Sequence, residues 1–325
     1  MKFFTKFALL LVFLAFSVSA FAGIPPQGVN LTKTATGYTI DFRLPSYNMN
    51  EVKVNGESFF QINSGEYGIT NEVGNPMLPQ VTFFLMISKS ETNPTFSVAS
   101  QNSDLKNLQW KVYPTQAPWE KNRPLEERPF TINRDYYNTN GSIENPFVKI
   151  SEPFIVGGAK GVMITVYPFA YNPSQNILKV TNTARININL KSEPALNFLP
   201  GMANNELFNS MFVNYTPAKN LGTNNYLIIT PAAYQSSLSA FVTHKTSMGY
   251  NVYVAPTTET GTTNTAILAY IQARYNNAST KPEFVLLVGD IADIPHWVGI
   301  GTDTPPTDLN YSLLEVSDAF ADVSL

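Results

Sequence analysis

Four side chains that could do chemistry follow a short apolar run, residues 284–288: Asp290, Asp293, His296 and Asp303. Carboxylate oxygens are the ligands that a hard cation such as calcium prefers, and the same oxygens could shape a pocket for a basic side chain. Structural carboxylates are the alternative, because aspartates in turns often hydrogen-bond neighbouring backbone groups. The spacing alone leaves these three interpretations open.

The sequence excludes both a cysteine nucleophile and a histidine-based zinc site. The chain has no cysteine, which excludes a thiol nucleophile and disulfides, and its two histidines, His244 and His296, stand in no zinc-binding spacing. We expect His244 to be solvated, since it lies beside Lys245 on the less apolar side of a predicted helix. His296, next to Trp297, reads as a packed loop histidine. Neither is a predicted catalytic base.

Two strand-plus-helix units lead into the acidic loop. Residues 226–230, 251–255 and 284–288 are short apolar runs typical of buried parallel strands. Helical periodicity separates them, and the strand–helix–strand order requires crossovers within a parallel sheet. The apolar stripes expected to face the sheet are Tyr234, Leu238, Phe241 and Val242 in the first helix, and Ile267, Leu268, Ile271 and Tyr275 in the second, which Thr263 or Asn264 caps. The sequence therefore predicts a partial α/β domain over residues 215–325.

The preceding part, residues 23–214, alternates apolar and polar positions with frequent turn residues. Residues 38–44 predict a strand, and residues 52–54 predict another that runs into an Asn-Gly turn. Residues 161–168 and 184–190, joined by a turn-rich link, predict a long hairpin. No sustained helical period occurs before Glu206, so we expect an all-β sandwich or barrel.

The first 22 residues have the pattern of a secretory signal peptide. Lys2 and Lys6 precede or flank an apolar run, and small residues up to Ala22 predict cleavage after that residue. The run is too short to span a bilayer, so we expect no transmembrane anchor. A net charge of −3 without a basic block excludes nucleic acid as an expected partner.

Eight segments in consistent order resemble the gingipain-type cysteine peptidase family. Two of them match patterns of that family's propeptide, and six match the opening of its peptidase domain, which includes Val288-Gly289-Asp290. The resemblance covers nearly all of the chain after the signal peptide. The segments are residues 74–79, 167–173, 225–230, 241–250, 271–272, 285–295, 307–311 and 317–323.

This resemblance implies a secreted zymogen, with a β-rich propeptide and a caspase-like α/β domain. In such a peptidase a Cys-His dyad cleaves polypeptide substrates, as histidine helps to generate the thiolate that attacks the carbonyl. Neither dyad member matches a residue here, and both are expected after Leu325. The resemblance also implies calcium near the sheet ends, with Asp290 as the matching ligand. The implied partner of the propeptide is its own catalytic domain, and the implied location is extracellular or on a bacterial surface.

The expected division is a signal peptide at 1–22, a propeptide at 23–214 and the first part of a peptidase domain at 215–325. Family propeptides are removed at basic sites, yet Asn214 precedes the boundary and Lys219 is the nearest basic residue after it. Both are candidate processing positions. The alternative function is a non-catalytic surface or adhesion protein that retains a peptidase-like half-domain.

Overall fold

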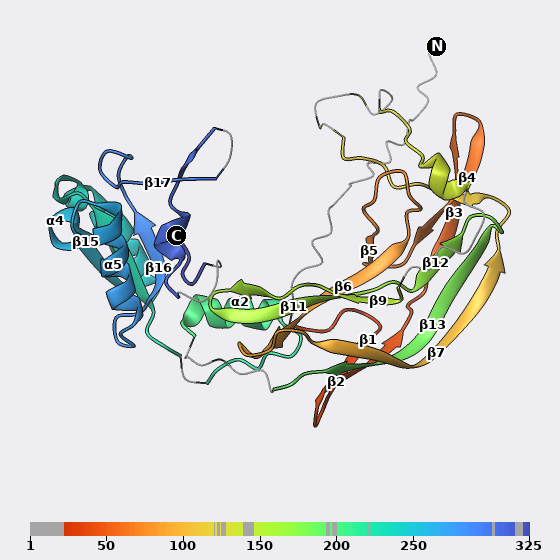
Figure 1. The fold of residues 1–325 in the computed structure, drawn as a ribbon, viewed down its shortest axis with the longest axis horizontal. Coiled ribbons are helices and arrows are strands. Elements are labelled where there is room, and N and C mark those ends of the chain that lie inside the picture. The colour runs from red at the N-terminus through yellow and green to blue at the C-terminus, as the bar shows by residue number, and fades with distance from the viewer. Residues whose placement is uncertain are drawn as a thin grey trace, which may run out of the picture.

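The computed structural model describes residues 23–119, 121, 124, 128–138, 146–192, 196, 200–219, 221–300, 303–315 and 321–325. The predicted signal peptide and its cleavage position, Ala22, lie outside these residues. Figure 1 shows a β-rich part and a part with helices around a small sheet, side by side along the long axis. We call them the β unit (residues 23–214) and the α/β unit (residues 215–325).

Two antiparallel sheets of five strands form the body of the β unit. The first contains β1 (Val29–Thr34), β2 (Gly37–Arg43), β7 (Thr95–Asn107), β12 (Phe169–Asn172) and β13 (Ile177–Asn189). The second contains β5 (Gly68–Ile69), β6 (Pro79–Ile87), β9 (Val148–Ile150), β10 (Phe154–Val156) and β11 (Ala159–Val166).

The apolar faces of these two sheets pack against each other. Ile40 and Ile186 come from the first sheet, Leu85 and Ile164 from the second, and all four are 0% exposed within one cluster. Strand residues alternate between faces, so each strand contributes every second side chain to this core. Burial of each such side chain stabilises the fold by about 1.5–3 kcal/mol. The prediction of a β-rich first part is confirmed.

A smaller sheet lies beside these two. It contains β3 (Asn48–Val54), β4 (Glu57–Asn63) and β8 (Lys111–Val112), and a short helix, α1 (Arg134–Tyr137), belongs to the same region. The predicted Asn-Gly turn joins β3 to β4, and Asn55 and Gly56 have φ values of 51° and 83°. Two positive φ values match the twist of a tight hairpin.

The predicted pairing of residues 161–168 with residues 184–190 is wrong. The first segment is largely β11, which pairs with β6 in the second sheet, whereas the second belongs to β13 in the first sheet. Between them the chain passes from one sheet to the other at Tyr167-Pro168, where a proline cannot continue the ladder. The hairpin that does form joins β12 to β13.

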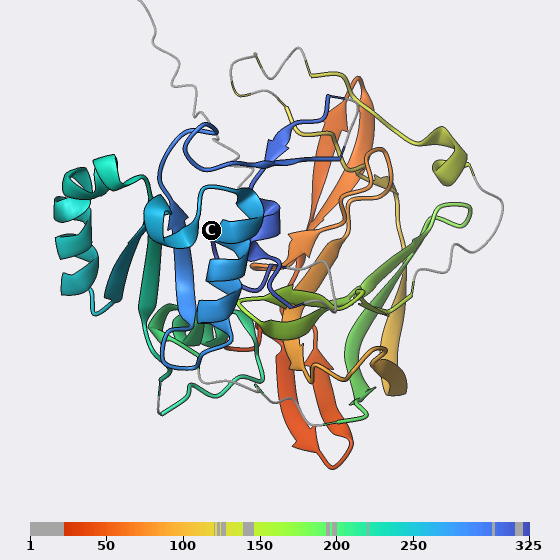
Figure 2. The same ribbon diagram turned by 60° about the vertical axis from the view of Figure 1, so that its left-hand side comes forward.

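The α/β unit is built on three parallel strands in the order β15 (Asn251–Pro256), β14 (Asn225–Thr230) and β16 (Pro282–Leu287). The helical segments between them are the 3₁₀ helix η2 (Ala232–Leu238), α3 (Ser239–Ser247), α4 (Thr257–Thr260) and α5 (Asn264–Tyr275). In Figure 2, α5 passes in front of the sheet and η2 with α3 lies at its left. The predicted strand–helix alternation is confirmed.

The two predicted helices differ in accuracy. Thr263 caps α5 by accepting a hydrogen bond from the Ala266 amide, and Ile267, Ile271 and Tyr275 are buried as expected. The first helix starts as a 3₁₀ turn, which rotates Tyr234 away from the predicted stripe. That side chain is 42% exposed, whereas Leu238, Phe241 and Val242 pack against the sheet. Among the described residues, no helix is long and apolar enough to cross a membrane.

After β16 the chain forms the short pair β17 (Trp297–Val298) and β18 (Pro306–Thr307), then the 3₁₀ helix η3 (Leu309–Ser312). It then returns to the sheet, because Ser324 forms a parallel bridge with Phe284 and its carbonyl accepts from the Val285 amide at 2.8 Å. The side of β16 away from β14 is therefore already occupied at this position.

The helix α2 (Met202–Met211) lies between the two units in Figure 1. It begins before Glu206, where the sequence pattern predicted no helix. Phe208 of α2 and Phe212, which follows its last residue, are buried in the β unit. After the helix the chain runs along β6 through a parallel bridge between Phe212 and Phe84.

Candidate functional site

The acidic loop lies at the carboxyl end of β16, where function gathers in open α/β sheets. Asp293 Oδ2 accepts hydrogen bonds from the Asp290 amide at 3.1 Å and from the Tyr234 hydroxyl at 3.3 Å. The carbonyl of Asp290 in turn accepts from the amides of Asp293 and Ile294. The charge of Asp293 raises the pKa of Tyr234, because ionisation would place two negative charges together. The turn is thus fastened by its own carboxylates.

Gly289 allows this turn. It has a φ of +148°, and a Cβ at this position would lie 2.7 Å from the Asp293 Cβ. Asp290 itself is exposed, and its Oδ1 accepts from the Ile291 amide at 2.7 Å. The carboxyl group of Asp290 is therefore accessible to solvent, although its Oδ1 also accepts a hydrogen bond within the turn.

The following loop is held by packing and two further hydrogen bonds. Trp297 meets Tyr311 edge to face at 4.6 Å between ring centroids, and the Tyr311 hydroxyl donates to the Pro295 carbonyl. Burial raises the pKa of Tyr311 to about 12. Asn264 donates to the His296 carbonyl at 3.2 Å. His296 is half-buried, in agreement with a packed loop histidine.

The other two candidate residues, His244 and Asp303, are both exposed to solvent. Exposure was expected for His244. Within the described part of the chain, no group of three or more histidine, cysteine, aspartate or glutamate residues could hold a metal ion. The acidic loop can thus orient polar groups at the sheet end, but it carries no thiol nucleophile.

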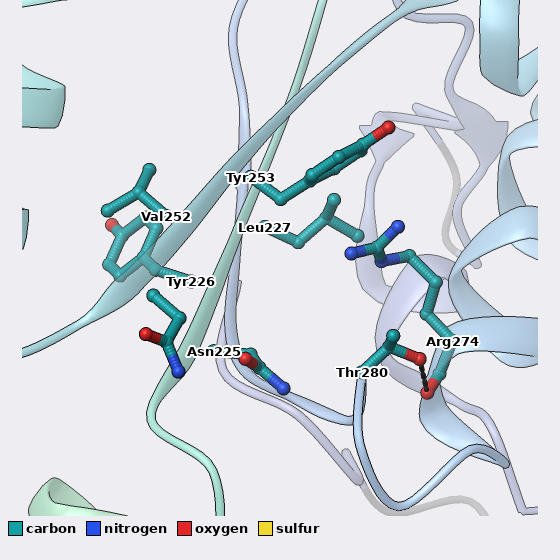
Figure 3. A pocket seen from close by; sticks show the side chains of 8 residues that line it. Asn225, Tyr226, Leu227, Val252, Tyr253, Arg274 and Thr280 are labelled. Carbon is teal, nitrogen blue, oxygen red and sulfur yellow. Dashed lines mark hydrogen bonds between the residues drawn. The ribbon is translucent and has the colours of Figure 1, made fainter.

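A pocket of about 170 Å³ opens at the opposite, amino end of the strands (Figure 3). The Arg274 guanidinium lies over the Tyr253 ring at 4.1 Å and donates to the Tyr270 hydroxyl at 3.0 Å. Glu259 accepts from both tyrosines, so one network spans α4, α5 and β15. The lining residues are Asn225, Tyr226, Leu227, Asn251, Val252, Tyr253, Arg274 and Thr280.

An ion pair joins the two units. Lys89 Nζ, just after β6, lies 2.8 Å from Glu315 Oε2 and 2.9 Å from Oε1. Tyr275 donates to Glu315 Oε1 at 3.1 Å, which links the pair to α5. The Glu315 backbone is fixed by buried Asp322, whose Oδ2 accepts from the Leu314 and Glu315 amides at 2.8 and 2.7 Å.

The two candidate processing positions differ in their surroundings. The Asn214 side chain pairs with the backbone of Met86, accepting from its amide at 2.8 Å and donating to its carbonyl at 2.9 Å. It also donates to the Tyr38 hydroxyl at 3.1 Å. Thr216, Pro217 and Lys219 are exposed.

Sequence reasoning missed the residues at the junction of the units. Lys89 and Glu315 are 226 positions apart, and no pattern in the sequence pairs them. Asp290 and Asp293 were found because they follow a buried strand. Residues 317–320, within one segment of the resemblance, lie outside the described residues.

Two family models match the chain in order. Propeptide_C25 matches residues 20–220, and Peptidase family C25 matches residues 219–325. Among curated proteins, Gingipain R2 of Porphyromonas gingivalis is 23% identical over 303 residues, which are 89% of this chain and 41% of that protein. Lys-gingipain of the same organism is 26% identical over 298 residues, or 86% of this chain and 17% of that protein.

A solved structure supports the fold. A chain in the complex of Porphyromonas gingivalis RgpB pro- and mature domains aligns with a TM-score of 0.51 and 19% identity, over 58% of this chain and 99% of that one. At this identity the likeness concerns the fold. The chain spans less than half the length of the curated relatives given above.

Proposed function

Because this chain belongs to the gingipain-type peptidase family C25, with propeptide and peptidase regions in the family's order, we propose that it is the precursor part of a secreted cysteine endopeptidase. The β unit is the propeptide, which inhibits the enzyme and assists its folding. Residues 215–325 begin a caspase-like catalytic domain. The ordered match of both family models is the observation that carries this proposal.

The proposed reaction is hydrolysis of peptide bonds in polypeptide substrates by a Cys-His dyad. This chain has no cysteine, so the thiolate must come from sequence that follows it in the natural protein. The described residues contribute the parallel sheet of β14, β15 and β16. In open α/β sheets the active site lies at the carboxyl ends of such strands. The comparisons do not favour the alternative of a non-catalytic adhesion protein.

The decisive experiment uses the natural-length protein. We expect peptidase activity that iodoacetamide abolishes, together with a histidine followed by a cysteine downstream of Leu325. Replacement of that cysteine by alanine should remove the activity while leaving the thermal unfolding midpoint unchanged. A natural-length protein without such a pair, or one whose activity survives alkylation, would contradict the proposed function.

The same proposal includes a calcium ion bound by Asp290. The exposed carboxylate at the end of β16 supports it. Backbone carbonyls and water would have to complete the coordination shell, because the described residues offer no group of three acidic or histidine ligands there. No step of the proposed reaction depends on this ion.

Processing and export complete the proposal. The exposure of Lys219 and the engagement of Asn214 by Met86 support a cut after Lys219. The apolar leader that ends at Ala22 supports secretion, to the extracellular space or the bacterial surface.

A further inference from the structure

Helix α2 is anchored at its two ends in two different units. Its carboxyl-terminal half belongs to the β unit, where Phe208 and Phe212 are each 0% exposed and pack with Met86 and Ala159. The ring of Phe212 stacks on that of Phe154 with 6.2 Å between centroids. This end of the helix therefore stays with the β unit.

The first residue of α2 contacts the α/β unit instead. Met202 packs against an aromatic cluster on one face of the parallel sheet, formed by Tyr226, Tyr250 and their neighbours. Tyr226 meets Tyr250 edge to face at 5.7 Å and stacks on Phe284 at 5.6 Å. Met202 thus covers part of an aromatic cluster that belongs to the α/β unit.

The first amides of α2, which have no acceptor within the helix, donate hydrogen bonds to side chains of the α/β unit. The N-cap residue, Gly201, has no side chain to accept a hydrogen bond. Asn224 Oδ1 accepts from the Met202 amide at 2.8 Å, and Glu283 Oε1 accepts from the Asn204 amide at 2.7 Å. Unpaired amides at a helix start need such acceptors, and a carboxylate there also complements the helix dipole.

The fit around Glu283 is close. Its carboxyl group is buried, and Oε2 finds no hydrogen-bond partner in the described part of the chain. A Cβ on Gly201 would lie 2.6 Å from Glu283 Oε2, although the φ of Gly201 is −67° and would suit alanine. The glycine is therefore required by the neighbouring carboxylate and not by the helix backbone.

We propose that Asn224 and Glu283 form a docking site for the first turn of α2, which keeps the β unit attached to the α/β unit after the linker at Lys219 is cut. This inference rests on the proposed function in taking α2 as part of a propeptide. The partner is a segment of this same chain, and the site recognises the Met202 and Asn204 amides and the Met202 side chain. Removal of α2 would expose a buried carboxylate beside an aromatic surface.

The test uses the whole chain with a site for a sequence-specific protease in place of residues 216–219. After complete cleavage, we expect the two pieces to co-elute on size exclusion and to separate only on dilution, which gives a Kd. Glu283→Ala removes the acceptor of the Asn204 amide at the start of α2 and should weaken the complex by ~10- to 100-fold. Glu283→Gln retains a carbonyl acceptor and should stay within about threefold of the parent.

Gly201→Ala tests the contact from the other side. It should weaken the complex in the parent and have little further effect in the Glu283→Ala background, because the clash is then gone. Glu259→Ala, an acidic residue of the same unit outside this junction, is the matched control and should leave the Kd unchanged.

Two results would overturn the inference: separation of the parent pieces immediately after cleavage, or equal effects of Glu283→Ala and Glu259→Ala. Circular dichroism of each intact variant before cleavage distinguishes weakened docking from misfolding. Neither result would bear on the proposed peptidase activity, which is tested separately through the downstream cysteine.

Discussion

Lys89 of the β unit and Glu315 of the α/β unit form an ion pair with an N···O distance of 2.8 Å. Each side chain is 32% exposed, so solvent screens the pair only partly. The carboxylate also accepts from Tyr275, which orients it toward the lysine. The two units are therefore joined by charge as well as by the linker between them.

Breaking this ion pair should destabilise the junction modestly. We expect Lys89→Met and Glu315→Gln each to lower the free energy of unfolding by about 1 kcal/mol, with a coupling of similar size in the double variant. Urea unfolding at low and high salt measures it, since salt should reduce the coupling. The exposed pair Lys53–Glu51 on β3, at 3.7 Å, serves as a control with no measurable coupling. Additive effects of Lys89→Met and Glu315→Gln would contradict this prediction.

Glu315 and Glu283 should change stability with pH in opposite directions. Burial would raise the pKa of Glu315, but hydrogen bonds and charge from Lys89 outweigh it and lower that pKa. Stability from a lowered pKa is present above the unfolded value and is lost as the pH falls through the folded value. Burial raises the pKa of Glu283 above 4.5, so its contribution is present below that value and is lost as the pH rises through the folded pKa.

Unfolding between pH 3 and pH 7 separates the two. The stability difference between parent and Glu315→Gln should grow as the pH rises through the usual carboxyl range. As the pH rises above 4.5, the parent should become less stable relative to Glu283→Gln. Parallel pH curves for the parent and both variants would exclude these assignments.

Asn214 should act as a structural clamp. Its amide pairs with both backbone groups of Met86, so Asn214→Ala leaves a partly buried donor and acceptor unpaired. We expect a loss of about 1–3 kcal/mol in urea unfolding. Asn209→Ala, at an exposed position of α2, should change stability by less than about 0.5 kcal/mol. Equal effects of the two variants would show that the clamp contributes nothing.

Processing should occur after Lys219. N-terminal sequencing of the mature natural protein is expected to begin at Asn220, and Lys219→Gln should block or shift that cut. A cut after Asn214 would first require its two hydrogen bonds with Met86 to open. A mature protein that begins at Tyr215 would refute this prediction.

Calcium binding at Asp290 is measurable by calorimetric titration of the whole chain with calcium chloride. We expect binding that Asp290→Asn weakens at least tenfold, while Asp303→Asn, an exposed aspartate after the same loop, has little effect. No heat at millimolar calcium, or equal effects of both variants, would rule out Asp290 as a ligand.

Local signals in the sequence predicted the elements of the α/β unit well. Thr263 marks the start of α5, because its hydroxyl accepts a hydrogen bond from the amide of Ala266, only three residues later. The apolar run of β14 is almost fully buried and that of β16 is buried or half-buried, so their composition reveals them, whereas Tyr253 in the run of β15 is 41% exposed. These features depend on residues that are close together in the chain.

The failures come from features that are close only in space. The start of α2 carries no side-chain cap of its own, because Glu283 supplies one from 79 positions away. Tyr234 was assigned to an apolar stripe, but its hydroxyl reaches Asp293 from the 3₁₀ turn. The segments 161–168 and 184–190 have hairpin-like patterns, yet alternation cannot tell which sheet a strand will join.

The separation between α2 and Glu283 has a consequence for the order of folding. Asn204 lies 79 positions before Glu283, so every residue of the β unit and of α2 precedes this acceptor in the chain. Until β16 joins its sheet, the Asn204 amide has no partner within its own helix turn other than water. The first turn of α2 is therefore completed only when the second unit folds.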